Sequence, residues 1–159
     1  MTRLPFADGS ADVATSFDVL YALDAPEART AVGEMWRVLR PGGVALVNVA
    51  ALDLLRGSHS ALTREKQRFS KRSLTDLLAG AGFRVERITF THMSSFPIAL
   101  LVRLVERLTG RADTASDADL RVPPAPVNAV FDGLLRLEAA WLRVGNLPIG
   151  SSLLAVVRK

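Results

Sequence analysis

The side chains of His59 and His92 are the ones in this sequence that titrate near neutral pH. His59 lies in a long polar connection, where it could act as a general base; the alternative is a solvated loop histidine. His92 follows a predicted strand and is more simply a satisfied or exposed side chain. The two histidines lack ligand spacing and the chain has no cysteine, so we expect no metal site, disulfide or cysteine nucleophile.

The composition is that of one soluble globular domain. The chain has 159 residues, 49% of them hydrophobic, and a formal net charge of +4, which excludes an intrinsically disordered chain. Its arginines are scattered and no block of like charge occurs, so we expect no nucleic-acid partner. No apolar run approaches the roughly 20 residues of a membrane span, and Met1–Phe6 lacks the apolar core of a signal peptide. We therefore expect a cytoplasmic protein.

The first 95 residues alternate between strand and helix patterns. Asp24 and Glu27 form a predicted capping box with Pro26 in the first helical turn. Glu34 and Arg37 share a helix face, and Arg37 could either cap the following turn or pair with a strand carboxylate such as Asp12. We expect strands over residues 11–16, 44–49 and 84–91, helices over about 24–39 and 70–80, and a turn at 40–43. The apolar 44–49 segment is typical of a strand covered on both faces, and the alternation predicts an α/β fold with a parallel sheet.

The last third has a different character. We expect helices over residues 97–108 and 128–144, and a final strand over 152–157. The first of these helices is apolar, with Arg103 and Arg107 four apart on one side. It could be a lid over a hydrophobic substrate or a membrane-surface contact; the alternative is an amphipathic helix packed on the sheet edge.

Three segments together resemble one family. Leu4–Val13 is similar to the LPF-x-D-x-S-F-D-V run of class I S-adenosylmethionine (SAM)-dependent methyltransferases of the type 11-like group. Arg37–Gly43 resembles the R-V-L-K-P-G-G turn of that family, and Leu74–Phe83 resembles its L-x-x-L-L-x-x-A-G-F helix end. The order and spacing agree across the first 90 residues, which makes the combination more specific than any one motif.

The resemblance implies the C-terminal part of a doubly wound, Rossmann-like methyltransferase sheet. It implies strands four to seven, the last of them antiparallel, with extra helices. Residues 1–159 would form one partial domain, with a sheet core at 1–95, a helical substrate cap at 96–148 and the final strand at 149–159. The Gly-rich loop by which the family approaches SAM has no counterpart, because no Gly-x-Gly stretch follows a predicted strand.

The resemblance also assigns candidate site residues. Ser16, Phe17 and Asp18 match family positions that line the methionine side of SAM; the alternative is a strand-to-helix turn with Phe17 in the core. Tyr21 and Ala22 replace a Glu-His pair found in some relatives. His59 is the candidate catalytic base.

The implied function is transfer of a methyl group from SAM to a small or lipid-like acceptor. We expect the chain to act as the C-terminal part of such an enzyme and to be inactive alone. A peripheral membrane contact is compatible with the apolar helix. The alternative is a non-catalytic pseudo-methyltransferase module whose exposed sheet edge pairs with a partner chain or a second copy.

Overall fold

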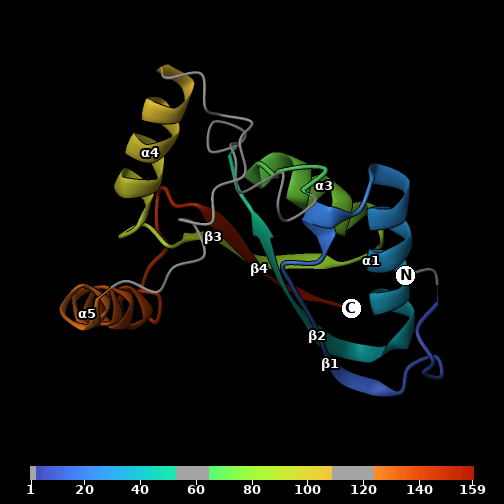
Figure 1. Cartoon of the computed structure of the whole chain (residues 1–159). Helices are drawn as coiled ribbons and strands as arrows, with labels where there is room; N and C mark the ends of the chain where they lie inside the picture. Colours follow the sequence, from blue (N-terminus) through green and yellow to red (C-terminus); the bar gives the residue numbers. More distant parts are fainter. Residues whose placement is uncertain (1–2, 53–64, 109–123) are drawn as a thin grey trace.

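The computed structural model describes residues 3–52, 65–108 and 124–159 (Figure 1). Its sheet has the order β1-β2-β4-β3. The strands are β1 (Ala11–Phe17), β2 (Leu39–Ala50), β3 (Arg84–Thr91) and β4 (Ser152–Arg158). The helices are the 3-10 helix η1 (Leu20–Ala22) and the α-helices α1 (Ala25–Val38), α3 (Lys71–Gly80), α4 (Phe96–Leu108) and α5 (Ala125–Trp141).

The final strand lies between two earlier ones. β1 pairs with β2 in parallel, whereas β4 is antiparallel to both β2 and β3. The sequence prediction of an α/β fold with an antiparallel last strand is therefore confirmed. Because β2 and β3 both oppose β4, they run in the same direction as each other and as β1.

Local sequence signals place the helix starts. The backbone N–H of Glu27 donates to Asp24 Oδ1 at 2.9 Å, and the N–H of Asp24 donates to Glu27 Oε2 at 2.8 Å. This is the predicted capping box, which satisfies N–H groups that the first turn leaves without partners. Ser70 begins α3 through an equivalent exchange with Ser73.

The Pro-Gly-Gly segment is not a separate turn. It lies inside β2, which begins at Leu39 directly after α1 and pairs with β1 through an irregular register. Gly42 has a φ of 80°, and a Cβ on Gly43 would lie 3.1 Å from the carbonyl oxygen of Asp12. The glycines therefore let the two strands approach at a bulge.

The core lies on one face of the sheet. Val47, Val49 and Val157 are fully buried against residues of α1 and α3 such as Val32 and Leu74. Val44 and Leu46, which point to the opposite face of β2, are only half-buried. The expectation that this strand is covered on both faces was wrong, because α1 and α3 pack against the same face.

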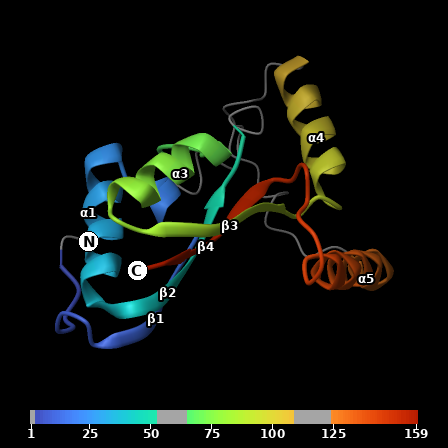
Figure 2. The ribbon, with the colours of Figure 1, turned by 180° about the vertical axis from the view of Figure 1, so that it is seen from behind.

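Two helices stand away from this core, at the end of the sheet distant from α1 (Figures 1 and 2). Beyond Phe96, most apolar side chains of α4 are exposed, so the alternative in which this helix packs on the sheet edge was wrong. The exposed set is Ile98, Leu101, Val102, Leu104, Val105 and Leu108. α5 buries none of its residues and spans Ala125–Trp141 rather than 128–144. No helix in the described parts of the chain is long and apolar enough to cross a bilayer.

Candidate functional site

The three parallel strands end at one edge of the sheet, and each is followed by a strained residue. Asp18 follows β1 with a φ of 54°, Leu52 follows β2 with a φ of 59°, and His92 follows β3 with a φ of 60°. No other non-glycine residue of the described ranges has a positive φ. Such backbone strain concentrates at functional sites, and this carboxyl edge is where open α/β sheets bind ligands.

A hydrogen-bonded pair fixes the first of these residues. Asn48 Nδ2 donates to Asp18 Oδ1 at 3.1 Å, and the N–H of Asp18 donates to the Asn48 carbonyl at 3.1 Å. Asn48 is 7% exposed, so its amide is a rigid support for the carboxylate. Asn48 was missed in the sequence, although it is the one polar residue in the apolar 44–49 segment.

The three sequence-predicted cofactor residues lie side by side at this edge. Ser16 is 7% exposed and Phe17 is 54% exposed, so the alternative that buried Phe17 in the core was wrong. Asp18 is exposed beside Phe17. An exposed aromatic ring next to a carboxylate suits a cationic ligand group.

A pocket of about 360 Å³ opens at the carboxyl edge, with α5 as one wall. Its lining combines strand ends with α5 side chains: Phe17, Asp18, Asn48, Thr91, His92, Leu135, Glu138, Ala139, Leu142 and Leu154. Glu138 fastens α5 to the end of β3. Its carboxylate accepts hydrogen bonds from the backbone N–H of His92 and, at 3.3 Å each, from the N–H and hydroxyl of Ser94.

One polar atom of this pocket is unsatisfied. Thr91 Oγ1 is buried and has no hydrogen-bond partner in the part of the chain that the structure describes. Buried polar groups normally have a partner, so the Thr91 hydroxyl is a departure from the usual pattern at the end of β3.

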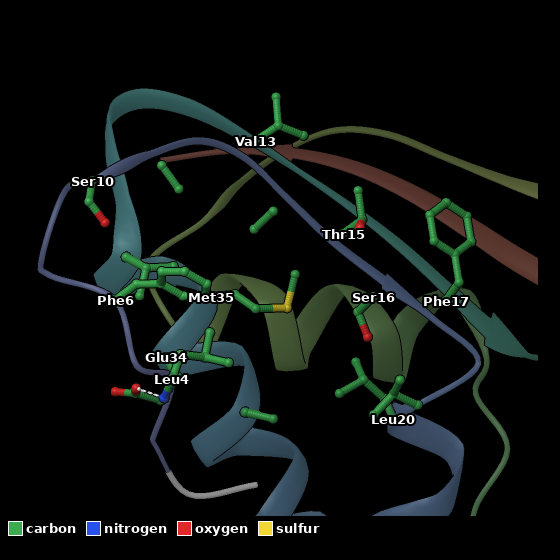
Figure 3. A pocket seen from close by; sticks show the side chains of 15 residues that line it. Leu4, Phe6, Ser10, Val13, Thr15, Ser16, Phe17, Leu20, Glu34 and Met35 are labelled. Carbon is green, nitrogen blue, oxygen red and sulfur yellow. Dashed lines mark hydrogen bonds between the residues drawn. The ribbon is translucent and has the colours of Figure 1, made fainter.

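A second concavity, of about 460 Å³, follows the outer edge of β1 (Figure 3). We call it the β1 groove. Its lining is mostly apolar: Leu4, Phe6, Ser10, Ala11, Val13, Ala14, Thr15, Ser16, Phe17, Val19, Leu20, Ala31, Glu34, Met35 and Val38. Figure 3 shows Val13, Thr15 and Phe17 on one side of the strand, and Ser16 on the side of Met35 and Leu20. Phe17 lines both concavities.

An arginine holds the N-terminal wall of the β1 groove. Arg37 makes a two-point contact with Glu34, at 2.8 Å for each nitrogen, and also pairs with Asp8. It donates to the carbonyls of Phe6 and Leu4 at 2.9 and 3.2 Å. The Arg37 contact and the Leu4 N–H hold the pKa of Glu34 at about 2. The expected partner of Arg37, Asp12, instead pairs with Arg40 at 2.8 Å.

The remaining sequence candidates have other positions. His59 lies outside the described residues. Tyr21 is in η1, where its carbonyl accepts from the N–H groups of Lys66 and Gln67 at 2.9 and 3.1 Å. Gln67 Nε2 also donates to the carbonyl of Leu20 at 3.2 Å. The carbonyls of Leu20 and Tyr21 thus anchor Lys66 and Gln67 against η1.

Comparisons with known proteins concern the family and the fold of this chain. Residues 1–47 match the family described as "Methyltransferase domain". A Mycolicibacterium smegmatis protein, described as a "Probable S-adenosylmethionine-dependent methyltransferase", is 38% identical over 154 residues, or 94% of this chain and 54% of that protein.

Solved structures share the fold. A SAM-dependent methyltransferase from Methanosarcina mazei matches 99% of this chain and 63% of its own, with a TM-score of 0.54 and 15% identity. A SAM-dependent methyltransferase from Archaeoglobus fulgidus matches 97% of this chain and 62% of its own, with a TM-score of 0.51 and 14% identity.

The chain therefore has the Rossmann-like fold of the class I SAM-dependent methyltransferases. More particularly, its first 47 residues match the model of the methyltransferase domain family, in the region where the motifs in Leu4–Val13 and Arg37–Gly43 resemble that family. The chain spans about half the length of the curated relative that it matches.

Proposed function

We propose that this chain forms the acceptor side of a SAM-dependent methyltransferase site, with Ser16, Phe17 and Asp18 at the sulfonium end of SAM. The observation that carries the proposal is the position of Phe17 and Asp18 in the carboxyl-edge pocket. In this pocket the exposed Phe17 ring lies next to the Asp18 carboxylate, which Asn48 holds in place, and α5 forms the facing wall.

SAM, when bound, supplies an electrophilic methyl group on a positively charged sulfur. The residues of this chain would act on the charge and the orientation of the reactants. The Phe17 ring and the Asp18 carboxylate favour a cation at the end of β1. Leu135, Leu142 and Leu154 provide apolar walls that exclude water around an acceptor. Holding the acceptor in line with the methyl group accounts for much of the rate of such a transfer.

A further segment of protein, bound along the β1 groove, would supply the part of the site that holds the nucleotide half of SAM. The groove is apolar and leads directly to Phe17. No partner strand pairs with the outer edge of β1 in the described ranges, and no Gly-x-Gly loop follows a strand in the sequence. We therefore propose that the chain is inactive alone and gains activity when a further segment pairs with β1.

The helices after β3 would form the substrate cap. α5 already lines the carboxyl-edge pocket through Leu135, Glu138 and Ala139. The exposed apolar side chains of α4 suit a small or lipid-like acceptor, or a peripheral contact with a membrane surface.

Titration of the ¹⁵N-labelled chain with S-adenosylhomocysteine tests this proposal by NMR. We expect weak binding, with a dissociation constant of about 1 mM, or about 4 kcal/mol of binding free energy. The largest shifts should fall on the amides of Ser16, Phe17 and Asp18. An absence of shifts at these amides, or shifts confined to another surface, would contradict the proposed site. Binding about a thousandfold tighter would contradict the need for a further segment.

The second candidate function is a non-catalytic module that pairs with a partner chain or a second copy. The exposed apolar edge of β1, with Val13 55% exposed, favours it. Analytical ultracentrifugation separates the candidates when combined with the titration. Association without S-adenosylhomocysteine binding supports the module, whereas a monomer at all concentrations that binds the ligand rules it out.

A further inference from the structure

The carboxyl-edge pocket has a charge pattern that restricts what it can hold. Its lining contains two carboxylates, Asp18 and Glu138, and one imidazole, His92. No lysine or arginine is among the described residues that line it. A carboxylate or phosphate group would meet like charge here without a compensating cation, whereas an ammonium group would meet opposite charge.

The two carboxylates have different roles. Glu138 is occupied by the N–H groups of His92 and Ser94 and by the Ser94 hydroxyl, so it is a positioning residue that holds α5 over the pocket. Asp18 accepts its one side-chain hydrogen bond, from Asn48, through Oδ1. Within the described residues no group donates to Asp18 Oδ2, which leaves this oxygen to meet a ligand.

The remainder of the lining is apolar apart from Asn48 and Thr91. Phe17, Leu135, Leu142 and Leu154 would surround a hydrocarbon or aromatic body. A pocket of about 360 Å³ suits a molecule with one or two rings.

We propose that the methyl acceptor of this site is an amine with an apolar or aromatic body, and that Asp18 binds its ammonium group and receives its proton. The inference rests on the proposed function. The bound ammonium gives one proton to Asp18, which passes it to solvent. The nitrogen lone pair then forms the bond to the methyl carbon of the sulfonium donor as the carbon–sulfur bond breaks. The electron pair of that bond stays on sulfur, and the product leaves as a methylammonium ion.

Three probes that share an indole body separate the charge of the head group from its shape. They are tryptamine, which is cationic, tryptophol, which is neutral, and indole-3-acetate, which is anionic. Binding is followed without SAM through the NMR shifts of the Asn48 side-chain amide and the His92 backbone amide. We expect tryptamine to bind about tenfold more tightly than tryptophol, or about 1.4 kcal/mol, and indole-3-acetate to bind most weakly.

The variant Asp18→Asn removes the charge and keeps the shape, and asparagine tolerates the left-handed backbone of this position. Tryptamine should then bind no more tightly than tryptophol. The control Asp132→Asn removes an equal charge on α5, where Asp132 pairs with Arg136 outside the pocket, and should keep the preference. Equal affinity of the three probes for the unaltered chain, or an unchanged preference in Asp18→Asn, would overturn the inference.

The S-adenosylhomocysteine titration distinguishes a failure of the amine assignment from a failure of the methyltransferase proposal on which it rests. Loss of amine selectivity with that ligand still bound at Ser16–Asp18 would overturn the amine assignment alone. Amine selectivity without S-adenosylhomocysteine binding would overturn the methyltransferase proposal and leave an amine-binding pocket.

Discussion

The two outer strands of the sheet, β3 and β1, differ in how their free sides are protected. The edge formed by β3 carries charges and is covered: Glu86 pairs with Arg84 and Arg158, and Arg87 donates to Asn146 Oδ1 at 2.7 Å and to the Gly145 carbonyl at 2.6 Å. Leu147 forms a bridge with Phe90, and a register irregularity interrupts the ladder between Val85 and Arg87.

Among the residues that the structure describes, the edge formed by β1 has none of these features between Val13 and Phe17. Its ladder with β2 is regular there, its exposed side chains include Val13 and Phe17, and the apolar β1 groove lies along it. Charges, bulges and covering loops prevent strand edges from pairing with other chains. The comparison shows that, within the described residues, the β3 edge is covered whereas the β1 edge between Val13 and Phe17 is open.

The largest effect is expected from Gly150→Ala, which breaks the covered edge. A Cβ at this position would lie 2.1 Å from the carbonyl oxygen of Thr91, so the backbone at the end of β3 must move. We expect a loss of about 3 kcal/mol in the free energy of unfolding, measured by urea denaturation. Gly133→Ala in α5 is the matched control, because nothing lies within 4 Å of its added Cβ. It should stabilise α5 by about 0.5–1 kcal/mol, and equal losses in both variants would contradict the packing described.

A charge on the open edge should abolish pairing without unfolding the chain. We expect the unaltered chain to self-associate as its concentration rises. Val13→Lys should weaken this association about tenfold or more, because lysine is a common protection of exposed strands. Val13 is 55% exposed, so the free energy of unfolding should change by only about 0.5 kcal/mol.

Sedimentation velocity over a range of concentrations measures the effect. Val13→Thr is the control, because threonine keeps the strand preference and adds no charge. Undiminished association of Val13→Lys would show that the chain associates through another surface.

The smallest expected effect is the pH dependence of stability that comes from Glu34, which lies in the wall of the β1 groove. The pKa of Glu34 lies at about 2, below its ordinary value of 4.5, because of the Arg37 guanidinium and the Leu4 N–H. A pKa lowered in the folded state means that ionised Glu34 stabilises the fold above pH 4.5 and that this contribution is lost as the pH falls through about 2.

The melting temperatures of the chain and of Glu34→Gln should therefore differ at neutral pH and converge as the pH falls from 4.5 to about 2. The carboxylate is near the surface, so added salt should reduce the difference. A difference that stays constant over this pH range would mean that Glu34 acts through its shape rather than its charge.

Local signals made much of the fold predictable. The Asp24–Glu27 capping box and the Ser70 helix start are short-range exchanges, and both occur where the sequence placed them. The entry of Pro41–Gly43 into β2 was not predictable, because it depends on pairing with β1, which no local pattern specifies. The sequence could not decide between an exposed and a packed α4, because periodicity indicates that a helix has an apolar face but not what covers it.

The candidate site was predictable only in part. Ser16, Phe17 and Asp18 follow one another at a strand end, so a family motif locates them. Glu138 meets His92 across 46 residues, and that contact arises from the tertiary arrangement of α5. Asn48 supports Asp18 across 30 residues. Neither the separation of the two residues nor their types predicts that they form a hydrogen bond.

The central claim, that β1 offers an unpaired edge beside the carboxyl-edge pocket, is tested most directly by amide hydrogen exchange of the dilute chain. The N–H of Asp18 donates to Asn48 of β2, so by alternation those of Val13, Thr15 and Phe17 point outward. We predict that these three amides exchange as fast as unprotected ones, while those of β3 that face β4 are protected. Protection of Val13, Thr15 and Phe17 equal to that of Val47 in β2 would show that the β1 edge is already paired and would contradict the account.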